Sequence, residues 1–155
     1  MRKGQVVLLS TALVLVSSEA FAGATQECLD KIYTAAQGKS AAQIYAASSQ
    51  YFDYGYVAHI AASRNKVKWD KAVEKEYTKN ARELAQRTVI PEIAKGLTSH
   101  PQFLREYAKN GLRYVVTNIG DNKVTFATNP ARCVVYDATM SGVSISTLLA
   151  DMMKQ

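Results

Sequence analysis

The residues most able to carry out covalent chemistry in this sequence are its two histidines and two cysteines. A histidine beside Cys133 could deprotonate the thiol and make it a nucleophile. Cys133, however, stands between Arg132 and Val134 in a strand-like pattern, where a packed or bridged sulfur is commoner than a reactive one. His59 and His100 also lie far apart in the sequence. We therefore favour a structural role for Cys133 over a catalytic one.

Other catalytic patterns are weaker still. Glu74 and Glu76 are two residues apart, so on a helix they point to different sides and make a poor pair of carboxylates. The sequence has no HExxH, CxxC or GxSxG motif and no glycine-rich phosphate loop. The histidines and cysteines are too few for a common metal site. We expect a protein that is not an enzyme and that holds no metal and no cofactor.

Residues 1–22 have the pattern of a secretory signal peptide. Arg2 and Lys3 precede an apolar run from Val6 to Val16, and Ala20-Phe21-Ala22 supplies small residues at a cleavage site. As a helix the run would rise about 16 Å, half of the roughly 30 Å that a membrane anchor must cross. We predict cleavage after Ala22 and export to the periplasm, with a retained anchor as the alternative. Residues 23–155 are expected to form a single domain.

Export bears on the cysteines and on the charge. In an oxidising compartment Cys28 and Cys133 could form a disulfide. Closing a loop of that length would stabilise the folded protein by about 4 to 5 kcal/mol in the chain-entropy model. Two separately buried thiols remain the alternative.

The composition, with 48% hydrophobic and 21% charged residues, is typical of a globular domain, and the net charge is +6 at pH 7. An exported chain seldom meets nucleic acid, so we expect lipid headgroups or an acidic protein as the anionic partner.

The elements expected to position these residues begin with helices. Apolar spacing of three and four residues and good capping side chains predict the following helical segments. They are Thr25 to Gln37, a short helix after Ser40, a third helix after Asp53, the longest helix after Asp70 as far as an interruption at Pro91, and Pro101 to Lys109 capped by Ser99 or His100.

After Gly111 the apolar period changes from 3.6 to 2, which is typical of strands. We expect strands at Arg113 to Ile119, Lys123 to Thr128 and Arg132 to Met140, with a three-residue turn at residues 120–122. A short helix from Val143 to Met153 closes the chain. Helices followed by a meander of strands predict an α+β domain, in which N-terminal helices pack on one face of a C-terminal antiparallel sheet.

Two stretches of this chain resemble motifs of the MlaC family, the periplasmic auxiliary components of Mla-type ABC transporters, also called toluene-tolerance proteins. The first is YFDYGYVAHIAASR from Tyr51 to Arg64, followed by a helix with Trp69 and Arg87-Thr88. The second is VYDATMSGVSI from Val135 to Ile145, similar to the family's strand-turn signature. Both occur in the family's order behind a signal peptide. The chain is similar to a shortened member of the MlaC family. The resemblance implies an MlaC-like, NTF2-like fold, in which a layer of helices covers a sheet.

The resemblance implies a monomeric carrier that shuttles phospholipid between membrane-bound complexes, one on the ABC transporter side and one at the outer membrane. An aqueous carrier must cover the acyl chains, because each methylene removed from water contributes about 0.8 kcal/mol. The residues we expect to line the lipid site are Phe52, Val57, Ile60 and Ala61 from the motif helix and Val115, Phe126, Val135 and Tyr136 from the sheet.

The same apolar residues also fit a plain core. Nine tyrosines, each with a large apolar body and a polar tip, suit either a solid interior or a cavity for an amphipathic ligand. The competing hypothesis is therefore a periplasmic interaction module, such as an inhibitor or an assembly factor, with a closed core and no ligand. A space between helices and sheet is the feature that favours the carrier.

Overall fold

The structure is a computed structural model that describes residues 25–97, 100–129 and 131–154. The predicted signal peptide and the predicted capping residue Ser99 lie outside the described residues. A first helix covers residues 25–36. The further helical segments are α2 (Ala41–Ser48), α3 (Tyr54–Arg64), α4 (Lys71–Leu84), the π-helical turn η1 (Ala85–Val89), α5 (Ile90–Gly96) and α6 (Ile145–Met153). The strands are β1 (Gln102–Lys109), β2 (Leu112–Ile119), β3 (Asn122–Asn129), β4 (Val134–Met140) and β5 (Val143–Ser144).

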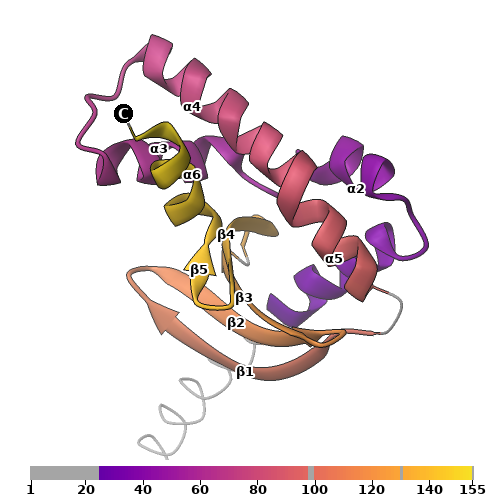
Figure 1. The fold of residues 1–155 in the computed structure, drawn as a ribbon. Helices are drawn as coiled ribbons and strands as arrows, with labels where there is room; N and C mark the ends of the chain where they lie inside the picture. Colours follow the sequence, from indigo (N-terminus) through magenta and orange to yellow (C-terminus); the bar gives the residue numbers. More distant parts are fainter. Residues whose placement is uncertain (1–24, 98–99, 130, 155) are drawn as a thin grey trace, which may run out of the picture.

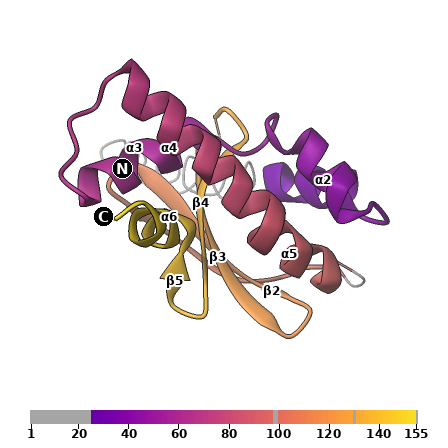
Figure 2. The same cartoon turned by 45° about the horizontal axis from the view of Figure 1, so that its top comes forward.

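The five strands form one antiparallel sheet in the order β1-β2-β3-β4-β5, and each strand pairs with its neighbour in sequence. The helices lie together on one face of this sheet, with α4 crossing over the others (Figures 1 and 2). The predicted α+β fold is confirmed at this level, as a layer of helices on an antiparallel meander.

Local side-chain caps define where the helices begin, as the sequence predicts. The Asp53 carboxylate accepts from the Tyr56 amide at 3.0 Å, and that of Asp70 accepts from the Val73 amide at 2.9 Å. At the start of α2 Ser40 forms a capping box with Gln43. These bonds satisfy amide groups that have no partner inside the first turn of a helix.

Pro91 does not end the helix that contains it. The helical backbone runs from α4 through η1 into α5, and Pro91 lies in the first turn of α5. A proline inside a helix lacks the amide hydrogen and clashes with the carbonyl four residues before it. The wider π-helical turn at Ala85–Val89 contains Arg87, the residue four before Pro91, and so accommodates the proline while the chain stays helical.

The predicted helix from Pro101 to Lys109 is wrong, because residues 102–109 form strand β1. Phe103, Leu104 and Tyr107 have helix-compatible spacing, but the backbone pairs along its length with β2 and the local preference is overridden. A register shift between Phe103 and Arg105 marks a bulge in this edge strand.

Two smaller boundaries also differ from the prediction. Ile119 pairs directly with Asn122, so the turn of the β2–β3 hairpin has two residues and not three. At the C-terminal end, residues 143–144 pair with β4 as strand β5, and α6 begins at Ile145 with Ser144 as its cap.

The main hydrophobic core includes the region where α3 packs against α4 and α6 (Figure 1). Val57, Ala58, Ala61 and Ala62 on α3 are all 0% exposed. A second, smaller cluster joins Leu29 to the sheet. None of the helices in the described part of the chain is long and apolar enough to span a bilayer.

Candidate ligand-binding cavity

A cavity of about 150 Å³ lies between the helical layer and the sheet. Its walls come mainly from the helix over residues 25–36, α2, the η1–α5 segment and the inner face of the sheet, and the first residues of α3 and α6, Tyr54 and Ile145, complete them. Representative wall residues are Leu29, Ile32, Tyr33, Ile44, Ala47, Tyr51, Phe52, Ala85, Ile93, Leu97, Phe103, Thr117, Ile119, Phe126, Val135 and Ala138. Two exposed members of the wall, Asp30 and Ala35, place its opening beside the helix over residues 25–36.

The cavity exists because short side chains face it where the helices span the sheet. Ala36, Ala47 and Ala85 contribute only a methyl group each to the wall. α2 has no buried residue at all, so it covers the cavity without filling it. Side chains that border a void lack partner atoms on that side and lose the corresponding dispersion contacts. The hollow therefore makes this part of the fold less tightly packed than the α3 region.

Three of the polar side chains in the wall, those of Thr117, Ser48 and Tyr54, have partners within the protein. The hydroxyl of Thr117 donates to the Val124 carbonyl at 3.0 Å. The Ser48 hydroxyl donates to the Tyr45 carbonyl at 2.6 Å and shares a 2.6 Å hydrogen bond with the Tyr54 hydroxyl. Burial raises the pKa of Tyr54, which keeps this phenol uncharged. With these groups satisfied, the cavity presents an apolar surface to a ligand.

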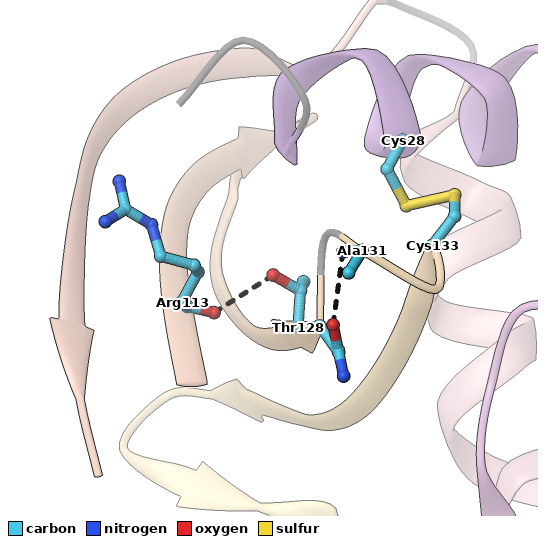
Figure 3. The surroundings of a disulfide bond; sticks show 6 residues. Cys28, Arg113, Thr128, Ala131 and Cys133 are labelled. Atoms are coloured by element: carbon cyan, nitrogen blue, oxygen red, sulfur yellow. Dashed lines mark hydrogen bonds between the residues drawn. A yellow bond between two sulfur atoms is a disulfide. The ribbon is translucent and has the colours of Figure 1, made fainter. Parts of the chain in front are cut away.

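Cys28 and Cys133 form a disulfide with their Cα atoms 5.2 Å apart, which resolves the two alternatives for the cysteines (Figure 3). The bond joins the helix over residues 25–36 to the turn before β4. Leu29 follows Cys28 and Val135 lies two residues beyond Cys133, and both line the cavity. The disulfide thus holds two walls together, and it indicates an oxidising compartment.

Of the eight residues predicted to line a lipid site, the structure brings three to the cavity wall. These are Phe52, Phe126 and Val135. Phe52 also forms an isolated parallel bridge with Val135, which fixes the backbone before α3 against the sheet. The second family-like motif therefore meets the beginning of the first at the cavity.

The other five predicted residues do not line the cavity. Val57 and Ala61 are completely buried in the core, and Ile60 on the same helix is half-buried away from the cavity wall. Val115 is buried in the cluster with Leu29 and Val135. Tyr136 stacks on Tyr56 with ring centroids 4.3 Å apart, and its hydroxyl accepts from Asn129 and Arg132.

Several wall residues were not among the predicted site residues. The amphipathic stripe of the first helix, with Leu29, Ile32 and Tyr33, was the available signal, but a stripe of that kind fits a solid core equally well. Phe103 could not be found because its segment was predicted to be helical. Ile93 lies beyond Pro91, where no helix was expected.

The structure also places the residues considered for catalysis. The His59 ring packs at a tilt against the Trp69 ring, with centroids 4.8 Å apart, and Cys133 is bonded to Cys28 and so has no thiol to activate. Within the three described stretches, no group of three His, Cys, Asp or Glu side chains could hold a metal ion. In a comparison with known proteins, the chain matches no family model and no curated protein.

Proposed function

We propose that this protein is a periplasmic carrier that holds the acyl part of a phospholipid in the cavity and shuttles it between membrane-bound transport complexes. The observation that carries the proposal is the apolar cavity between the helical layer and the sheet, which opens beside the helix over residues 25–36. The disulfide supports export, and the two family-like motifs that meet at Phe52 and Val135 support a lipid as the cargo.

The size of the cavity sets how a lipid would enter. An apolar cavity of about 150 Å³ stays dry and accepts a molecule the size of benzene. A part of an acyl chain therefore fits the cavity as it is in this structure, and a longer stretch requires the helices to move away from the sheet. α2 is the element best suited to move, because it has no buried residue and contacts mainly α5 and η1. Each methylene that enters contributes about 0.8 kcal/mol.

The proposal is tested by native mass spectrometry of the protein, exported and gently purified. Ala47 on α2 lines the cavity, whereas its neighbour Ala46 is exposed and does not. We expect phospholipid adducts on the wild type and on Ala46→Trp, and loss of most adducts on Ala47→Trp, whose indole fills the cavity. A clean apo mass for all three proteins across preparations would instead support the interaction module with no ligand.

A further inference from the structure

The rim of the cavity carries a charged side chain, which its apolar interior lacks. Among the described residues that line the cavity, Asp30 is the only one with a charged side chain. Its side chain is 52% exposed, so it lies at the opening and not in the interior. A lipid that enters tail first leaves its headgroup at this opening, because moving a charged group into an apolar space is strongly unfavourable. The headgroup would therefore rest beside Asp30.

His100 is the other polar group at this point of the rim. Its Nε2 atom lies 3.6 Å from the Asp30 carboxylate, and its ring packs edge-on against Tyr33 with centroids 4.7 Å apart. Tyr33 is itself part of the cavity wall. Asp30 and His100 thus form a polar pair beside an apolar wall, with Asp30 on the helix over residues 25–36 and His100 two residues before β1.

The charged residues beside wall residues in the sequence are less available to a headgroup, because none of them lines the cavity. Lys31 follows Asp30, but consecutive helix residues point about 100° apart and Lys31 does not line the cavity. Lys95 and Glu92 on α5 flank the wall residue Ile93 and form an ion pair with each other at 3.0 Å. The charge at the rim is therefore the negative charge of the Asp30 carboxylate, which lies beside the His100 imidazole and forms no ion pair with a lysine or arginine among the described residues.

We propose that Asp30 selects phospholipids whose headgroup carries an ammonium group, such as phosphatidylethanolamine, over phospholipids with an anionic headgroup. This inference rests on the proposed lipid-carrier function and names the class of lipid. The ammonium pairs with Asp30, and the adjoining phosphate lies where the imidazole of His100 can donate to it. The net charge of +6 predicts the opposite preference, for anionic lipid, so the two effects are separable by experiment.

The test uses delipidated protein purified after export, together with mixed vesicles of phosphatidylethanolamine and phosphatidylglycerol, in equal amounts and with identical acyl chains. Both lipids then share the same tails and the same vesicle surface, and only the headgroup distinguishes them. The protein is separated from the vesicles, and its bound lipid is quantified by mass spectrometry. For a half-exposed ion pair we expect the ammonium lipid to be enriched by about two- to fivefold.

Three variants decide the role of Asp30. Asp30→Asn should bring the enrichment close to one without lowering the total bound lipid, and Asp30→Lys should reverse it. Asp151→Asn makes the same change in charge on the exposed side of α6, remote from the rim, and should keep the wild-type ratio. Bound lipid at the vesicle ratio, or a preference unchanged in Asp30→Asn, overturns this inference and leaves the carrier function standing. Absence of bound lipid in every protein overturns both.

Discussion

The helices α2 and α3 are both rich in alanine, yet they lie in regions of opposite character. α3 buries five of its residues and is enclosed by α4 and α6, whereas α2 buries none and packs mainly on α5 and η1. On α3 the methyl groups of Ala58, Ala61 and Ala62 let neighbouring helices approach closely. On α2 and the first helix, alanines face the sheet across a distance that they cannot fill, and the cavity results.

This contrast separates the part of the fold that supplies stability from the part that can bind a ligand. Local opening is easiest where few apolar contacts must break, and ligand-binding elements belong to that class. The α3–α4–α6 region, which we call the packed end, should open only in global unfolding. The first helix, α2 and α5, which we call the cavity end, should open at a lower free energy.

The largest expected effect comes from Leu149 on α6, at the packed end. Its side chain is 0% exposed in the main core cluster. Leu149→Ala removes three buried carbons and leaves a void, so we expect a loss of about 2 to 5 kcal/mol in the free energy of unfolding. Urea denaturation followed by circular dichroism measures this value.

The neighbouring residue provides the matched control for Leu149. Leu148 is 37% exposed on the outer side of the same helix, and Leu148→Ala should change stability by no more than about 0.5 kcal/mol. Equal losses for the two variants would mean that α6 is not packed as described and would remove the distinction between the two ends.

The second prediction concerns the disulfide, which anchors the cavity end. Replacing both cysteines, Cys28→Ser with Cys133→Ser, releases a crosslink between residues 105 positions apart, and we expect a loss of about 2 to 4 kcal/mol. Hydrogen exchange should show that protection falls more in the helix over residues 25–36 than in α3. A uniform fall in protection across both helices would contradict a separate cavity end.

The sequence predicts where helices begin better than it predicts strand β1 or the cavity, for a physical reason. Helix starts at Asp53 and Asp70 depend on side chains three residues from their partners, so local sequence is sufficient. Strand β1 depends on pairing with β2, and no local pattern in residues 102–109 reveals it. Phe52 lines the cavity and Val57 does not, because the surrounding helices and strands fill the space around Val57 only. The local motif that contains both residues does not reveal this difference.

The third prediction compares the same substitution at the two ends. Ala61 is 0% exposed between helices, and Ala61→Leu should destabilise the protein by about 1 to 3 kcal/mol because neighbouring atoms must move. Ala36 lines the cavity, and Ala36→Leu places its added carbons in empty space. We expect that variant to be neutral or more stable by about 0.5 to 1 kcal/mol in chemical denaturation. Destabilisation at both positions would show that the cavity end is as tightly packed as α3.

The smallest expected effect concerns Asp137, a half-buried residue of β4 whose carboxylate contacts the start of α6. It accepts hydrogen bonds from the Ser146 hydroxyl at 2.5 Å and from the Ala138 amide at 2.9 Å. Burial nevertheless dominates and raises the pKa of Asp137, while the bonds from Ser146 and the charge of Arg64 oppose this rise. The folded protein therefore binds this proton more tightly than the unfolded chain does.

A raised pKa fixes the sign of the pH dependence. The stabilisation from protonated Asp137 is complete below the usual carboxyl pKa of about 4 and is lost as the pH rises through the raised pKa of the folded state. Asp137→Asn cannot ionise, so its melting temperature relative to the wild type should increase as the pH rises from 4 to 7. Thermal melts of both proteins at matched ionic strength measure this difference. Parallel curves would mean that the carboxylate is solvated in the folded protein, and the dense packing inferred for the α6 region would then not extend to its N-terminal end.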